Sequence, residues 1–364
     1  MKRLKAIDIF RGLNLAIMVW VHLRDWWIIN GPNSTLNIIT SSFIDRSSGG
    51  MFMFISGIST FISYDNRIKK ISETYTLQML RNEYLFRALL ILAIALVYNI
   101  FVAIRVMNPL IIWTWFMLLS IAVSLFMAWP LLKKSKSLRI TLAIIIFFLN
   151  DFIFWLLAQY KNKPNFYGIL YFVLYNTIEL DPILAAFPFF LIGTVIGDLI
   201  LEIFNMEDQK EKKQAVKKKI LFPSLIIGIG LIVFTIIFIF PEFFQGKNFY
   251  WIYFSLGVCL IFMSVLLTLE AYGIFSTSKS YKFLFYYSYF SLTVYLSHNV
   301  LYFLFYGQMS EGQFWLFVTV AIILYVILLK FLYKKYGSSF SLKIQIGKLA
   351  LGLSKELEKR KNRD

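Results

Sequence analysis

The chain has 364 residues, of which 59% are hydrophobic and 19% aromatic, and its formal net charge is +17. A soluble domain of this size is usually close to half apolar, so this composition excludes an ordinary soluble globular protein. The single cysteine, Cys259, lies in an apolar run, which excludes a disulfide framework and a cysteine-based metal cluster. No histidine or cysteine has the spacing of metal ligands, so we expect no metal site.

Apolar runs of near 20 residues recur along the chain, and each is long enough to cross about 30 Å of hydrocarbon. The first run carries internal charges and lacks a small-residue cleavage site, so we interpret it as a transmembrane helix rather than a signal peptide. The predicted fold is an all-α, polytopic membrane helix bundle of about ten transmembrane helices. The expected spans are about 8–29, 46–64, 84–104, 110–132, 139–159, 182–203, 220–241, 249–270, 284–306 and 314–333.

Basic residues are concentrated in alternate connections between these spans. The N-terminal MKRLK, the even-numbered connections and the C-terminal end are basic, and the odd-numbered connections are poor in lysine and arginine. By the positive-inside rule, this asymmetry places both termini in the cytoplasm. The positive charge then faces anionic lipid, so we expect membrane lipids as partners and no nucleic acid.

The sequence divides into a membrane part and a short tail. Residues 1–336 form the predicted membrane domain, and residues 337–364 form a cytoplasmic tail. Apolar and basic residues alternate in the tail as in an amphipathic helix on the inner membrane surface.

The lysine-, isoleucine- and aromatic-rich composition favours a prokaryotic source, so we expect a multi-pass protein of a prokaryotic cell membrane. A homodimer stays open.

Four ionisable residues form a stripe along the first predicted helix, which also carries Arg24. Eleven residues separate Arg11 from His22, which closes within about 20° of three full helical turns and about 16 Å along the axis. The resulting stripe also holds Asp8, three residues before Arg11, and Asp25, three residues after His22. Ionisable groups at membrane depth cost about 3 kcal/mol each and usually face a cavity or a partner. A purely structural alternative is an interfacial ion pair of Asp8 with Arg11, and an anchoring role for Arg24 and Asp25 at the outer end of the helix.

The two histidines of the chain are predicted to lie at a similar depth. His298 is followed by Asn299 and falls about fourteen residues into the expected span 284–306, which runs in the same direction as the first helix. His22 and His298 then both lie in the outer half of the bilayer. Histidine is the side chain best suited to take and return a proton near neutral pH, so the pair indicates one functional site.

Small residues indicate close helix contacts. Gly12 lies beside Arg11, and Ser56 and Gly57 lie in the expected span 46–64. Gly193-x-x-x-Gly197 lies in the span at about 182–203, and such motifs are more often packing surfaces than binding sites.

Four stretches of this sequence resemble the transmembrane acyltransferase superfamily. AIDIFRGLNLAIMVWVH resembles its opening motif, in which Asp-x-x-Arg-Gly is followed by a histidine eleven residues after the arginine. GGMFMFISGIS and YSYFSLTVYLSHNVLYF are similar to its second-helix and late-histidine motifs. AAFPFFLIGTVIGD resembles a helix of the branch related to heparan-α-glucosaminide N-acetyltransferase. These motifs are spread over residues 6–64 and 181–306.

The resemblance implies an enzyme that takes an acyl group, usually acetyl, from cytoplasmic acyl-CoA and passes it to a glycan or other hydroxyl or amine acceptor on the far side. His22, Asp25 and Arg11 are then the expected catalytic residues. We expect His22 to act as general base or acyl carrier, Asp25 to orient its imidazole or raise its basicity, and Arg11 to bind a CoA phosphate or stabilise charge at the thioester oxygen. Asp8, Ser56, Gly57, His298 and Asn299 are the expected residues for binding acyl-CoA or the acceptor. The lysosomal heparan enzyme resembles this stretch with asparagine at the His22 position, and its active histidine falls near Asn33 here.

Two other function classes remain. One is a transporter or flippase of a polar lipid or glycan intermediate, in which the histidines relay protons. No pair of corresponding broken helices is evident, which counts against a secondary transporter. The other is a non-catalytic membrane protein that has kept these costly residues. Binding of CoA separates an acyltransferase from a transporter.

Overall fold

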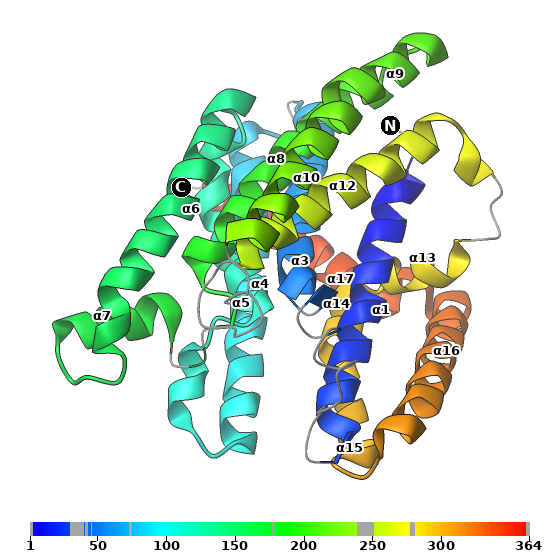
Figure 1. The fold of residues 1–364 in the computed structure, drawn as a ribbon. Helices are drawn as coiled ribbons and strands as arrows, with labels where there is room; N and C mark the ends of the chain where they lie inside the picture. Colours follow the sequence, from blue (N-terminus) through cyan, green and yellow to red (C-terminus); the bar gives the residue numbers. More distant parts are fainter. Residues whose placement is uncertain are drawn as a thin grey trace. The chain divides into compact units, whose positions relative to one another are not determined.

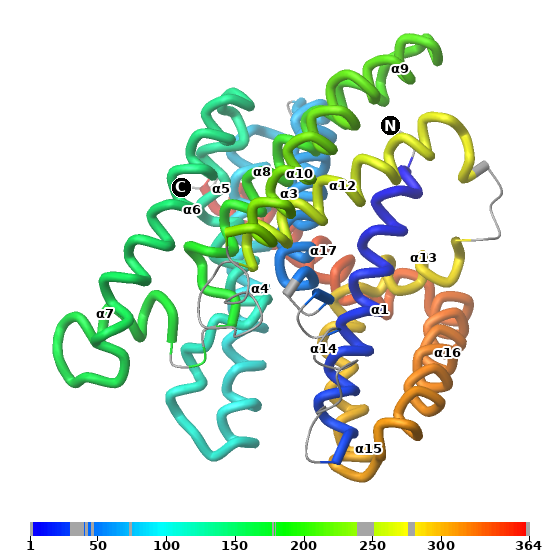
Figure 2. The backbone as a smooth tube through the Cα atoms, viewed as in Figure 1, coloured from blue at the N-terminus to red at the C-terminus, as the bar shows by residue number. Residues whose placement is uncertain are grey.

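The computed structural model describes residues 3–29, 40, 43–44, 46–72, 75–176, 178, 180–238, 251–276 and 281–361. Within these ranges the chain is helical, and its only extended pairings are two isolated bridges, Ile28 with Met309 and Ser72 with Tyr75. The predicted all-α class is therefore confirmed. Figure 1 and Figure 2 show the helices in chain order.

Eight helices in the described part of the chain are long and apolar enough to cross a membrane. They fall on eight of the ten expected spans, which confirms a multi-pass integral membrane protein. The expected span 46–64 is the helix α3 (Arg46–Ile68), whose glycines, serines and polar end make it less apolar than the other spans. The expected span 284–306 is broken into short helical pieces. The connection between the fifth and sixth expected spans contains an additional short apolar helix, α7 (Phe166–Tyr175).

The chain forms two compact units. The first comprises Met1–Phe52 and Glu202–Gln345, and the second comprises Met53–Leu201 and Ile346–Asp364. The two helices α3 and α17 (Leu342–Lys361) each contribute to both units. The described helices of the first unit are α1 (Lys5–Trp27), α9 (Gln209–Val216), α10 (Phe222–Phe238), α12 (Trp251–Ala271), α13 (Lys282–Tyr289), α14 (Ser291–Ser297), α15 (Tyr302–Phe305) and α16 (Glu311–Tyr336).

In the first unit, α1 packs against α12, α13, α14, α15 and α16. Its contact with α13 is close, because a Cβ atom on Gly12 would collide with the carbonyl oxygen of Leu284. This confirms the predicted packing role of Gly12. Many aliphatic side chains of α10 and α16 are exposed, among them Ile226 at 72% and Leu316 at 66%. Such surfaces are unfavourable in water and are expected where helices face lipid.

The C-terminal end of α1 is held by the turn before α16. The amide of Gly307 donates to the carbonyl of Trp26 at 2.8 Å, and the amides of Gln308 and Met309 donate to the carbonyl of Trp27 at 3.1 and 2.9 Å. The amide of Ile29 donates to Met309 at 2.9 Å. These bonds satisfy carbonyl groups that a helix end leaves without intrahelical partners, and they fix the last turn of α1.

The predicted ninth span is discontinuous. α13 ends at Tyr289, α14 covers Ser291–Ser297, a 3₁₀ segment covers His298–Leu301, and α15 covers Tyr302–Phe305. Neither proline nor glycine lies in this stretch, so its apolar sequence predicted a regular helix. His298 lies at the point where the α-helix tightens into the 3₁₀ segment.

The described helices of the second unit include the C-terminal part of α3, α4 (Leu77–Arg105), α5 (Met117–Ala128), α6 (Lys136–Leu157), α7 and α8 (Ile183–Phe204). α3 and α8 approach closely, because a Cβ on Gly57 would collide with the carbonyl of Phe190, and one on Gly193 with that of Phe54. The predicted packing role of Gly193 is confirmed.

Charged and polar residues also hold the second unit together. The buried Arg139 of α6 forms an ion pair with Asp198 of α8 and donates to the Thr194 hydroxyl at 3.1 Å.

The predicted C-terminal tail is the helix α17, in which Ile346, Ala350 and Ser354 are buried on one face. The Ser354 hydroxyl donates to the carbonyl of Met79 at 2.8 Å, so this end of the chain packs against the start of α4.

Candidate active site

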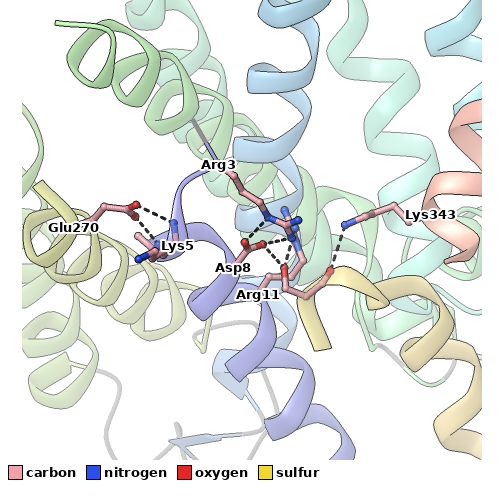
Figure 3. Close-up of polar contacts among 8 residues, drawn as sticks. Arg3, Lys5, Asp8, Arg11, Glu270 and Lys343 are labelled. Carbon is pink, nitrogen blue, oxygen red and sulfur yellow. Dashed lines mark hydrogen bonds and ion pairs between the residues drawn. The ribbon is translucent and has the colours of Figure 1, made fainter. Parts of the chain in front are cut away.

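The first turn of α1 is capped by a residue distant in sequence. Leu4 at the N-cap position offers no side-chain acceptor. The carboxylate of Glu270, at the end of α12, accepts the amides of Lys5 at 2.9 Å and Ala6 at 2.6 Å. Figure 3 shows Glu270 reaching this turn. A carboxylate that satisfies two free helix amides also interacts favourably with the helix dipole.

Replacing Glu270 by glutamine is expected to lower the free energy of unfolding by about 1 kcal/mol, because the amide group has one acceptor oxygen instead of two. The measurement is the thermal midpoint of the purified protein in detergent. Glu202→Gln is the control, because Glu202 forms a surface pair with Lys219 and such pairs contribute little. Equal midpoints for wild type and Glu270→Gln would contradict the capping role.

One turn further along α1, Asp8 is the centre of a polar cluster (Figure 3). Asp8 is buried and accepts two bonds from Arg3, from Nε at 2.6 Å and from Nη2 at 2.9 Å. The hydroxyl of Ser288 on α13 donates to Asp8 at 2.8 Å and accepts from Arg11 Nη1 at 3.2 Å. Lys343 donates to the backbone carbonyl of Ser288 at 3.3 Å.

The cluster gathers three cationic side chains around one carboxylate. Burial lowers the pKa of Arg3, but its hydrogen bonds to Asp8 and the charge of Asp8 outweigh that effect, so the pKa is raised overall. Asp8 is bonded directly to Arg3, and the Ser288 hydroxyl connects Arg11 to the same carboxylate. The surplus of positive charge can attract an anionic group to this end of α1.

At the other end of α1, the two histidines are in contact. Nδ1 of His22 lies 2.7 Å from Nε2 of His298, and the two rings are 4.9 Å apart. His298 is fully buried, and His22 is half-buried. The prediction that the two histidines lie at one depth is borne out by this geometry, because residues 276 positions apart form one pair within the first unit.

The hydrogen bonds of the pair determine which nitrogen carries each proton. Nδ1 of His298 lies 3.3 Å from the carbonyl oxygen of Val294, which can only accept. Nδ1 of a neutral His298 is therefore the donor and its Nε2 the acceptor, so Nδ1 of His22 must donate. A neutral His22 then carries its hydrogen on Nδ1 and has a lone pair on Nε2, which is the form of the ring that can accept a proton.

Aromatic rings fix the positions of both imidazoles. Trp26, four residues after His22, lies 5.2 Å from the His22 ring and stacks on His298 at 5.6 Å with an interplanar angle of 9°. Tyr302 meets Trp26 edge-on at 5.4 Å. The indole of Trp27 donates to the carbonyl of Leu301 at 2.9 Å. Packing of this kind restricts the rotamers of both histidines, as a preorganised site requires.

Comparison with known families decides which family the sequence represents. Residues 3–237 match the family model described as heparan-alpha-glucosaminide N-acetyltransferase, catalytic. The match covers more than half of the chain. The chain belongs to this family. A comparison with curated proteins gives no match.

The heparan-alpha-glucosaminide N-acetyltransferase family is one of transmembrane acetyltransferases, which agrees with the eight apolar helices. The matched residues contain all of α1, including Arg11 and His22. His298 lies beyond them. The histidine pair thus joins the matched region of this acetyltransferase family to a later segment of the chain.

Asp25 is placed differently from the expectation that it orients His22. Its Oδ1 accepts from Arg24, from Nε at 3.0 Å and from Nη2 at 2.7 Å. Arg24 is buried, whereas Asp25 is exposed. Nδ1 of His22 is bonded to His298 instead.

The other predicted binding residues divide between the two units. The amide of Asn299 donates to the carbonyl of Leu296 at 3.4 Å, within the 3₁₀ turn that holds His298. Ser56 and Gly57 belong to the second unit, where Gly57 forms the close contact with α8. Asn33, near which the resemblance puts the active histidine of the lysosomal enzyme, lies outside the described residues.

Several residues at the site were not predicted from the sequence. Trp26 and Tyr302 surround the histidines, and Arg3 and Ser288 complete the Asp8 cluster. For Trp26 the sequence holds a signal, because a residue four positions after His22 lies on the same helix face. For Ser288 it holds none, because its contact with Asp8 depends on where α13 begins.

Proposed function

We propose that the protein is an acyl-CoA-dependent membrane acetyltransferase that acts on a hydroxyl or amine of a glycan or another acceptor on the extracytoplasmic side. The observation that supports this most directly is the hydrogen bond from His22 Nδ1 to His298, which leaves Nε2 of His22 with a lone pair. A general base needs such a lone pair within reach of the proton that it removes. Membership of an acetyltransferase family supplies the reaction class.

In the proposed reaction, Nε2 of His22 takes the proton of the acceptor hydroxyl or amine as the acceptor atom bonds to the thioester carbon. The carbon–sulfur bond breaks, and the thiolate of CoA takes the proton back from His22. The products are the acetylated acceptor and free CoA, and His22 returns to its neutral form. His298 is a positioning residue: its Nε2 accepts the Nδ1 hydrogen of His22 and holds the ring while the imidazolium is present.

The two ends of α1 then have different roles. Arg11 lies eleven residues before His22, about 16 Å along the helix. With Arg3 and Lys343 it provides positive charge that suits the phosphates of CoA, and Asp8 holds the cluster in place. We place this end on the cytoplasmic side, because the basic connections lie there by the positive-inside rule. CoA would thus enter at the Asp8 cluster, with its thioester directed toward His22.

The first test is release of free thiol from acetyl-CoA by the full-length protein in detergent, with and without a panel of amino sugars and other hydroxyl or amine acceptors. We expect slow release without acceptor and faster release with the correct one. The outcome that would contradict the proposal is a protein that neither binds CoA nor releases thiol, but moves a polar lipid or glycan across vesicle membranes in a way that depends on a proton gradient. That result would favour a transporter.

A further inference from the structure

A second group of charged and hydroxyl side chains lies in the second unit, where α3 ends and α4 begins. Glu83 of α4 is buried. One of its oxygens pairs with Arg67 at 2.6 Å, and the other accepts from the Tyr75 hydroxyl at 2.6 Å. Both oxygens of the carboxylate are therefore occupied. Arg87, one turn further along α4, lies close enough for its charge to interact with those of Arg67 and Glu83.

These residues do not balance one another's charge. Two guanidinium groups, Arg67 and Arg87, lie near the one carboxylate of Glu83, which leaves one positive charge in excess among the three. Nε of Arg87 is buried and has no hydrogen-bond partner among the described residues. Membrane proteins rarely keep such a charge near an apolar helix unless it has a partner or a function.

Two further tyrosine hydroxyls in this unit, those of Tyr84 and Tyr64, also have no hydrogen-bond partner among the described residues. Tyr84 is only 7% exposed, its hydroxyl has no hydrogen bond within the described ranges, and Arg87 follows it by three residues on the same helix, a spacing that puts the two side chains on one face. Its ring packs on Trp129 at 4.9 Å. Tyr64, 6% exposed, packs on the same indole at 5.8 Å, and its hydroxyl is likewise buried without a partner. Buried donors without acceptors are costly, so they indicate a ligand rich in acceptor atoms.

We propose that Arg67, Arg87 and Tyr84 bind a phosphoryl group. A guanidinium donates in a planar fork that matches phosphate oxygens, and a tyrosine hydroxyl adds a third donor. The site lies at the start of the apolar helix α4, next to the basic connection at about 65–83, where phosphate from a lipid headgroup or from a soluble nucleotide can arrive. The proposal does not depend on acetyl transfer at His22.

The test uses the full chain in a phosphate-free maltoside detergent and two separate probes. One is short-chain phosphatidylglycerol and the other is CoA, and each is titrated while the thermal midpoint and the dissociation constant are followed. We expect at least one probe to raise the midpoint of the wild type. Arg87→Gln should weaken binding of that probe by at least about tenfold, because a charged hydrogen bond is lost. Arg105→Gln, at the opposite end of the same helix, should leave the affinity unchanged.

Tyr84→Phe separates binding from a structural role. Removing a buried hydroxyl without a partner should raise the thermal midpoint of the ligand-free protein and weaken the probe about fivefold. A hydroxyl that served structure alone would lower that midpoint and leave the affinity unchanged. This variant also decides the matter if Arg87→Gln fails to fold.

Each outcome has a defined meaning. Effects of these substitutions on phosphatidylglycerol alone would identify a lipid headgroup site, and effects on CoA alone a nucleotide phosphate site. The proposal is overturned if the wild type binds neither probe, or if both variants bind both probes as the wild type does. Thiol release from acetyl-CoA can persist in either case, so failure here and failure of the proposed acetyl transfer are distinguishable.

Discussion

Replacing His22 by alanine is expected to lower acetyl transfer by about 10²- to 10⁴-fold, the usual contribution of a general base. The reason is the lone pair on Nε2, which the hydrogen bond from Nδ1 to His298 directs to that nitrogen. The measurement is acceptor-dependent thiol release, with the thermal midpoint and gel filtration as evidence that the variant folds. Wild-type transfer by His22→Ala would reject this base.

Two further variants separate the base from its surroundings. His298→Gln keeps an acceptor opposite His22 Nδ1 and should retain more activity than His298→Leu, which removes it. Adding either change to His22→Ala should lower activity little further, because residues that act as one unit are not additive. Asp25→Asn is the matched control: Asp25 accepts from Arg24, so its activity should stay near that of the wild type. An Asp25→Asn protein as inactive as His22→Ala would return the orienting role to Asp25.

Replacing Gly57 by alanine is expected to destabilise the second unit by about 3 kcal/mol, near the upper end for overpacking. The added Cβ would collide with the backbone carbonyl of Phe190, which cannot rotate away as a flexible side chain can. α3 and α8 would have to separate, and with them the matching contact of Gly193 with Phe54. The measurement is the yield of monodisperse protein and its thermal midpoint in detergent.

Gly230→Ala provides the control for this prediction. Gly230 lies in α10, and an added Cβ there would meet nothing within 4 Å. Alanine has a higher helix propensity than glycine, so this variant should be as stable as the wild type or slightly more stable. If Gly57→Ala and Gly230→Ala have equal midpoints, the close contact between α3 and α8 does not limit stability.

Most of the fold could be predicted from composition, because lipid permits few arrangements of the backbone. Eight expected spans agree with apolar helices of the structure, since the length needed to cross a membrane is fixed. The break in the span 284–306 could not be predicted, because it contains none of the residues that usually interrupt a helix. The packing of α17 on Met79 was also beyond reach, because a basic amphipathic pattern fits both a membrane surface and a protein surface.

The candidate site could be predicted in part. Helical spacing placed Asp8, Arg11 and His22 along one helix, and equal depth indicated that His22 and His298 belong together. The partner of His22 was harder to predict, because Asp25 has two basic side chains within three residues, those of Arg24 and His22. In the structure Arg24 is adjacent and charged, and it takes the carboxylate. Contacts such as that of Asp8 with Ser288 depend on tertiary packing, which spacing within one helix does not reveal.

The bonds at the two ends of α1 have a mechanical consequence. Glu270 holds the first turn, and the residues 307–309 hold the last, so α1 cannot slide or rotate against its neighbours without breaking one set. A movement of α1 that separates His22 from His298 would therefore have to break bonds at one of these ends. A cycle that parts the two imidazoles by sliding α1, as in a moving proton carrier, is opposed by both sets of bonds. A fixed pair suits an enzyme, in which the substrates move and the base stays still.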